Sequence, residues 1–134
     1  MKLKVFNMGT VRNQQRTAKI PFVQVNAKAG VFTINRAAAE LIGVTDGDQV
    51  QFLQDEEDPA AWYIEKVKTG GFTIRFKESA GLLFNSTELA RIIFESVNCK
   101  YKSGRMLLGD RVNSLKGRIM FTLVTASLNA YKGE

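Results

Sequence analysis

Hydrophobic and polar positions follow the same pattern in two stretches of this chain, residues 22–42 and 72–93. Each stretch starts with alternating apolar and polar residues, passes through an Ala-Gly pair, and continues with a second apolar run, an Asn and an amphipathic segment. The alternation predicts strands, and the apolar spacing after the Asn predicts a helix. A pattern that recurs after about fifty residues indicates one supersecondary unit used twice.

Nine short segments are predicted to be strands, because each is rich in aromatic or β-branched residues and bounded by Gly, Asn, Asp or Pro. They are residues 2–6, 21–25, 31–34, 49–53, 62–67, 72–76, 82–84, 105–108 and 118–125. Asn35 is expected to cap a first helix that ends at Gly43, and Asn85 with Glu88 resembles the capping box of a second. The apolar residues expected to face the core are Ala38, Leu41 and Ile42 on the first helix and Leu89, Ile92, Ile93 and Val97 on the second.

These elements predict an α+β fold of duplicated strand-rich units, each closed by one helix, with antiparallel sheets packed against the two helices. We expect a single domain, residues 1–134, made of two pseudo-repeats, about 1–45 and 46–98, followed by C-terminal strands in residues 99–134. No run approaches the ~18 apolar residues of a membrane span, and the N-terminus lacks the apolar core of a signal peptide. We therefore expect a cytoplasmic protein without a membrane partner.

The residue types present exclude several kinds of chemistry. The chain has no histidine and one cysteine, Cys99, so a Cys/His zinc site, an internal disulfide and a Ser-His or Cys-His catalytic pair have no residues to form them. The acidic run at residues 55–58 is interpreted as a solvated turn, and a divalent-cation site is the alternative. We expect no enzymatic activity, no metal and no cofactor.

Charge is segregated along the chain. Residues 1–39 contain seven basic and no acidic residues, residues 40–65 contain eight acidic and no basic residues, and residues 99–118 are again mainly basic. With a formal net charge of +6, this asymmetry favours a polyanionic partner, and nucleic acid is the first candidate. The alternative is that the acidic middle and the basic termini pair with each other in an oligomer.

Binding of a single strand needs basic side chains for the phosphates and aromatic faces for the bases. In residues 72–77, alternation directs the Phe and Ile side chains to the core and Arg75 and Lys77 outward. Trp62 and Tyr63 take opposite faces of a strand, so one ring is expected in the core and the other is a candidate stacking platform. The expected nucleic-acid-binding residues are Arg12, Arg16, Lys19, Trp62, Arg75, Lys77, Lys100, Lys102 and Arg105.

Residues 30–52 contain a strand after a Gly, a short helix that closes with Ile-Gly-Val, and a Gly-Asp turn into the next strand. The matching positions are Gly30, Ile34, Gly43, Val44, Gly47 and Asp48. This segment resembles the AbrB-type swapped-hairpin family of transition-state regulators, although Asn35 stands where that family usually has Pro and the chain has one copy of the full motif. The same residues also suit a helix stop and a tight turn. The resemblance implies a regulator that binds duplex DNA.

The wider order of elements, four strands and then a helix used twice, is similar to the Whirly and PUR families of single-stranded nucleic-acid binders. That resemblance implies curved basic sheet surfaces with helices packed behind them. We therefore expect a DNA-binding homodimer or larger homo-oligomer that favours single-stranded DNA. The alternatives are an AbrB-like transcriptional regulator of duplex DNA and a structural or assembly module of a phage or mobile element that binds no nucleic acid.

Overall fold

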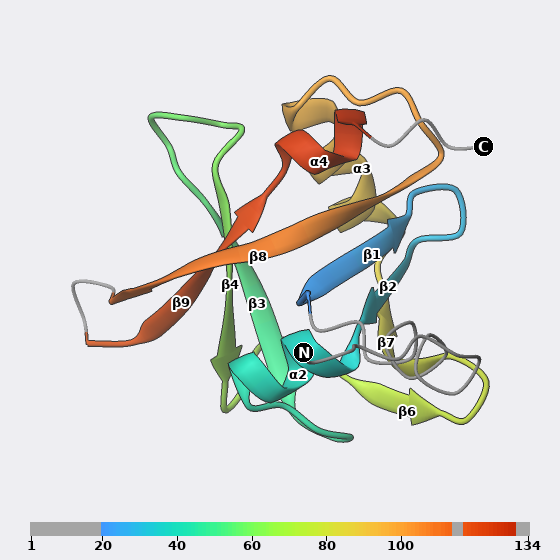
Figure 1. Cartoon of the computed structure of the whole chain (residues 1–134), viewed down its shortest axis with the longest axis vertical. Coiled ribbons are helices and arrows are strands. Elements are labelled where there is room, and N and C mark those ends of the chain that lie inside the picture. The colour runs from blue at the N-terminus through green and yellow to red at the C-terminus, as the bar shows by residue number, and fades with distance from the viewer. Residues whose placement is uncertain (1–19, 114–116, 131–134) are drawn as a thin grey trace, which may run out of the picture.

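The computed structural model describes residues 20–113 and 117–130 (Figure 1). The expected strand at residues 2–6 lies outside the described residues. Within the described ranges the elements are β1 (Phe22–Asn26), β2 (Val31–Ile34), α2 (Arg36–Ile42), β3 (Gln49–Gln54), β4 (Trp62–Val67), β5 (Phe72–Thr73), β6 (Arg75–Lys77), β7 (Gly81–Asn85), α3 (Thr87–Ser96), β8 (Ser103–Asn113), β9 (Ile119–Val124) and α4 (Ala126–Ala130).

The described strands form one antiparallel sheet in the order β5-β3-β4-β9-β8-β1-β2-β7-β6. The two outermost strands, β5 and β6, are separated along the chain only by Ile74. The Ile74 N–H donates to the carbonyl of Asp48 (2.8 Å), and its own carbonyl accepts from the N–H of Gly47 (2.8 Å). The segment of residues 72–77 therefore bridges β3 and β7, and the sheet becomes a nearly closed barrel.

The predicted α+β fold, with sheets packed against two helices, is therefore wrong. The strands of both units join one continuous sheet, and closing that sheet on itself pairs strand edges that would otherwise stay open. The helices are short: α2 lies at one end of the barrel, and α3 and α4 lie at the other (Figure 1). The core therefore lies inside the barrel rather than between a sheet and a helical layer.

The topology is approximately twofold symmetric. Exchanging β1 with β5/β6, β2 with β7, β3 with β8 and β4 with β9 leaves the order of strands around the barrel unchanged. The pairing of residues obeys the same exchange. Phe32 corresponds to Leu83 and Phe84 to Thr33, and both Phe32–Phe84 and Thr33–Leu83 are paired across β2 and β7. The two halves related by this exchange are β1 to β4 and β5 to β9. Their strands interleave, since β1 pairs with β8 and β5 pairs with β3.

Stacked phenylalanine rings occupy the interior. The Phe84 ring lies between those of Phe32 and Phe72, with ring centroids 4.7 Å and 4.9 Å away. Phe52 packs against the same group, with its centroid 5.5 Å from that of Phe32. Each of the four comes from a different strand, so the rings tie together the strands β2, β3, β5 and β7 by burial of apolar area.

Helix α2 begins and ends where the sequence predicts. The Asn35 side chain accepts a hydrogen bond from the N–H of Ala38 (2.9 Å), and Gly43 ends the helix with a φ of 84°, so both predictions are confirmed. Leu41, predicted to be buried, is exposed, because so short a helix contacts the barrel over a narrow arc. The buried residues of α2 are Ala38, Ala39 and Ile42.

Helix α3 is capped one residue later than predicted. Ser86 is the cap, and its hydroxyl accepts a hydrogen bond from the N–H of Leu89 (3.1 Å). Asn85 is instead the last residue of β7, where its side chain accepts a hydrogen bond from Arg75 (2.6 Å). Ile92, expected in the core, is exposed, and the buried residues of α3 are Ala90, Ile93 and Phe94.

Candidate functional site

The net charge of the chain lies outside the described residues. Residues 20–113 and 117–130 contain twelve basic and twelve acidic side chains, so this part is formally neutral. Five of the six excess positive charges belong to residues 1–19, which contain no acidic residue, and the sixth to Lys116. A basic surface on the described part can therefore form only where basic and acidic side chains occupy different regions, because their numbers are equal.

One row of side chains crosses the outer face of five adjacent strands. The register places Gln24 between Arg105 and Thr33, and Leu83 between Thr33 and Arg75. The alternate residues of β1 and β2 are buried, so Gln24 and Thr33 face outward, whereas Leu83 is only 5% exposed and interrupts the accessible row at β7. A guanidinium thus stands at each end of a row about 19 Å long, from four strand spacings, with neutral side chains between.

Neutral groups orient the two arginines. The Arg105 guanidinium lies 4.5 Å from the centroid of the Phe22 ring, and Arg75 donates to the Asn85 amide oxygen. Neither arginine forms an ion pair with a carboxylate of the described residues. Both charges therefore remain available to an anion while the side chains are held in place.

Three lysines extend this face at one end. Lys28 lies in the β1–β2 turn, and Lys100 and Lys102 lie in the connection from α3 to β8. The carbonyl of Lys102 accepts a hydrogen bond from the N–H of Ala27 (2.8 Å), which holds the two segments side by side (Figure 1). We call the exposed side chains of both groups the basic face: Lys28, Arg75, Lys77, Lys100, Lys102 and Arg105.

Acidic side chains lie mainly elsewhere. The run at residues 55–58 forms the β3–β4 connection, where Asp55 accepts a hydrogen bond from the N–H of Glu57 (2.8 Å) and Asp58 accepts one from the N–H of Ala60 (3.3 Å). These bonds are typical of a polar turn. Within residues 20–113 and 117–130, no cluster of three or more Cys, Asp or Glu side chains is arranged to hold a metal ion.

Five of the nine predicted binding residues are exposed, in two groups: Lys100, Lys102 and Arg105 near the start of β8, and Arg75 and Lys77 on β6, four strand spacings away around the barrel. Arg12, Arg16 and Lys19 lie outside the described residues. Lys28 was missed, because the pairing of β1 with β8 that places it beside Lys102 is a long-range contact.

Trp62 must be withdrawn from the predicted interface. It is only 3% exposed, and its indole N–H donates to the hydroxyl of Ser96 (2.9 Å). A buried ring cannot offer a face to a base. Alternation puts Trp62 and Tyr63 on opposite faces of β4 but does not tell which face is buried. In the barrel it is the face of Trp62 that points to the interior.

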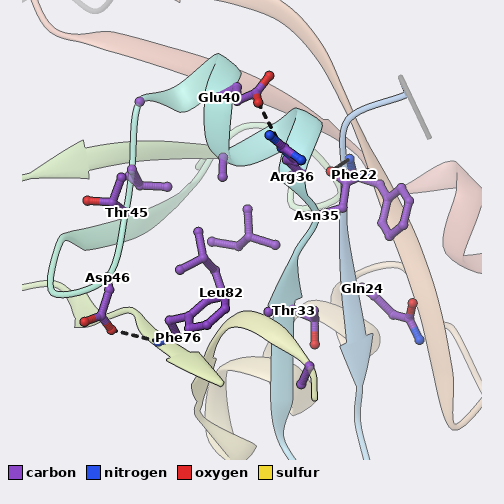
Figure 2. A pocket seen from close by; sticks show the side chains of 16 residues that line it. Phe22, Gln24, Thr33, Asn35, Arg36, Glu40, Thr45, Asp46, Phe76 and Leu82 are labelled. Atoms are coloured by element: carbon purple, nitrogen blue, oxygen red, sulfur yellow. Dashed lines mark hydrogen bonds and ion pairs between the residues drawn. The ribbon is translucent and has the colours of Figure 1, made fainter. Parts of the chain in front are cut away.

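A groove of about 880 Å³ opens beside the basic face, between α2 and the β6–β7 hairpin (Figure 2). Most of its lining surface is apolar and comes from Phe22, Ile34, Ala39, Val44, Phe76 and Leu82, and Gln24 and Thr33 of the outer row line it as well. Arg36 with Glu40 and Asp46 with Phe76 lie on different sides of the opening (Figure 2). Its size suits a few side chains or a small ligand.

Phe76 is on the groove rather than in the core, where alternation placed it. Its side chain is 58% exposed, and its N–H donates to the Asp46 carboxylate (2.7 Å). Alternation fails here because the strand changes partner at Ile74, from β3 to β7. The sequence contains no local signal of that change.

The groove is the open counterpart of a closed contact between the two halves. At the closed contact the N–H of Ser86 donates to the carbonyl of Gly30 (2.8 Å). The twofold exchange maps this pair onto Asn35 and Gly81, but the N–H of Asn35 donates instead to Phe22 (3.2 Å). The β6–β7 hairpin therefore diverges from α2 and leaves the groove between them.

No protein-family model, curated protein or solved structure matches this chain. The resemblances to AbrB-type, Whirly and PUR proteins therefore stay predictions from the sequence. None of the helices in the described ranges is long and apolar enough to cross a membrane. What the chain does must be argued from the basic face and the groove.

Proposed function

We propose that this protein binds nucleic acid on its basic face, with single-stranded DNA favoured. The observation that supports this most directly is the row that joins Arg105 to Arg75 across five strands. The strands β1, β2, β6 and β7 contain no acidic residue, and in β8 the first is Asp110, beyond Gly109. Glu78, in the turn after β6, is the acidic residue nearest in sequence to Lys77.

Lysine and arginine side chains at this spacing suit phosphates, and the neutral row between them suits sugars and bases. Gln24 and Thr33 supply hydrogen-bonding groups without charge, and the exposed ring of Tyr101 lies between Lys100 and Lys102 in the chain. Contacts of this kind tolerate many sequences, since phosphates are common to all of them.

The shape of the face favours a single strand over a duplex. Its contacts come from strands and turns, and it carries no helix of the kind that enters a major groove. A flexible single strand can follow the convex outside of a barrel and bring successive phosphates to the row. Residues 12–19, which hold Arg12, Arg16 and Lys19, join the described chain at Ile20 and add charge to the same molecule.

A polarisation titration with labelled single-stranded and duplex DNA of the same sequence, at two salt concentrations, tests the proposal. If four side chains neutralise phosphates, affinity for the single strand falls by about 50-fold between about 50 and about 200 mM salt. No binding at low salt overturns the proposal. Preference for the duplex would support an AbrB-like regulator, and a salt-sensitive oligomer without DNA affinity would support an assembly module.

A further inference from the structure

The groove beside α2 leaves an unusual amount of apolar surface uncovered. Ile20 is 63% exposed and Phe76 is 58% exposed, the two highest values for large hydrophobic residues in the described part of the chain. Both are at the groove: Phe76 lines it, and the Ile20 carbonyl accepts a hydrogen bond from Asn35, which also lines it. A continuous exposed apolar surface of this kind indicates a place where another segment docks.

The described chain starts at the rim of this groove. Asn35 donates to the carbonyl of Ile20 (2.9 Å) and accepts from the N–H of Phe22 (3.0 Å), so the chain is anchored where it passes the opening. Nineteen residues precede Ile20, and an extended chain of that length reaches as far as about 60 Å. Any part of residues 1–19 can therefore reach the groove.

The composition of residues 1–19 complements the groove. In residues 2–5 basic and apolar side chains alternate, so an extended conformation puts Leu3 and Val5 on one face and Lys2 and Lys4 on the other, where Phe6 follows them. The groove offers a mainly apolar wall, and at its opening lie the carboxylates of Asp46 and of Glu40, which is paired with Arg36 (3.3 Å). Apolar side chains can turn inward while the lysines face these carboxylates.

We infer that residues 2–6 of this chain dock in its own groove, with Leu3 and Val5 against the apolar wall. This docking covers Phe76 and supplies the contact that the β6–β7 hairpin loses where it diverges from α2. It is a contact within the protein that does not rest on the proposed nucleic-acid binding, and it covers Gln24 and Thr33, which line the groove and also belong to the outer row. Its test can therefore be made without any nucleic acid present.

Protection of a thiol on the groove wall measures the docking. Ala80 is exposed and lines the groove, so Ala80→Cys places a thiol there, and site-resolved mass spectrometry separates its labelling from that of Cys99. In the full chain, labelling should be about tenfold slower than in the same chain with Leu3→Ser and Val5→Ser, equivalent to ~1.4 kcal/mol of docking free energy. Equal rates would overturn the inference.

Two controls keep the result specific. Lys2→Ser with Lys4→Ser changes the same segment on its other face and should leave most of the protection at Ala80→Cys. Glu56→Cys, exposed in the β3–β4 connection, should react equally fast with either N-terminal sequence. Unchanged labelling of the half-buried Cys99 shows that each variant is folded.

Disulfide trapping decides which chain supplies the segment. A chain with Val5→Cys and Ala80→Cys, oxidised at low protein concentration, should form an intramolecular bond and migrate as a monomer. A dimer linked between these positions would overturn the inference in favour of a second copy. Val5→Cys with Glu56→Cys should form no such bond, and frequent bonding there would mean that the segment samples the whole surface.

Discussion

Glu65 on β4 pairs with Arg118, the residue before β9, with the carboxylate Oε1 3.7 Å from the guanidinium Nη1. Glu65 is 1% exposed, whereas the Arg118 side chain is 50% exposed. Gln51 also donates to Oε1, and Oε2 has no hydrogen-bond partner among the described residues. The barrel therefore buries a carboxylate whose ion-pair partner among the described residues, Arg118, comes just before β9.

Removing that cation should destabilise the fold. Arg118→Met leaves Glu65 buried beside Gln51 alone, and we expect a loss of about 1–3 kcal/mol, less than for a fully buried pair because Arg118 is half exposed. Glu65→Gln should cost less, since it removes the buried charge itself. Urea unfolding measures both, with Arg111→Met as the control on an exposed residue of β8; equal losses in Arg118→Met and Arg111→Met would contradict the assignment.

Gly30 and Gly81 test the symmetry of the two halves. Both have positive φ, 71° and 82°, so an alanine at either position costs about 1–2 kcal/mol. At Gly30 an added Cβ would also lie 2.5 Å from Thr87 Oγ1, whereas at Gly81 it would meet no atom within 4 Å. Unfolding measurements should therefore find Gly30→Ala less stable than Gly81→Ala by about 1–3 kcal/mol.

A nearly equal loss at Gly30 and Gly81 would show that the contact between Gly30 and Thr87 is loose. The double variant Gly30→Ala with Thr87→Ser tests which atom causes the loss of stability. It removes the Thr87 methyl group and keeps the hydroxyl that the added Cβ meets. Little recovery of stability is then expected, and full recovery would place the strain elsewhere.

The contribution of Arg75 and Arg105 to binding can be distinguished from the contribution of net charge. Arg75→Gln with Arg105→Gln removes two phosphate contacts, so the slope of log affinity against log salt should become shallower by about 1.4 for a single strand. Lys68→Gln with Arg111→Gln removes the same charge from exposed positions off the basic face and should leave the slope nearly unchanged. Polarisation titrations with a labelled single strand measure both; equal effects would mean that only net charge matters.

Asp48 makes part of the stability dependent on pH. The N–H of Thr45 donates to its carboxylate (2.9 Å), and this bond, aided by Lys66 at 3.7 Å and opposed by partial burial, lowers the pKa of Asp48 below its ordinary value of 3.8. Since the folded state favours the ionised form, the stabilisation is present above the ordinary pKa and is lost as pH falls through the lowered pKa.

Asp48→Asn should therefore lower Tm at about pH 6 and lose most of that effect near about pH 2, where the wild-type carboxylate is also protonated. Thermal unfolding across this range compares the two proteins. Glu56→Gln, exposed in the β3–β4 connection, serves as the matched control. A Tm difference between wild type and Asp48→Asn that does not change with pH would mean that the charge contributes nothing.

Local features of this protein could be predicted from its sequence. The Asn35 cap and the Gly43 helix stop depend on neighbours within a few residues, and both are where they were expected. The positions of most strands follow for the same reason, because alternation and turn residues act over short distances. The apolar groove had no such signal, because its walls come from α2 and from a hairpin forty residues away.

The repeated order of hairpin and helix and the separation of basic from acidic segments can be read directly from the amino-acid sequence. Long-range pairing in the folded chain joins the strands of both halves into one barrel, exposes Phe76 while it buries Trp62, and puts Arg75 and Arg105 in one row. Turn and cap geometry depends on adjacent residues, whereas strand partners are chosen by burial and edge pairing between segments far apart in the chain.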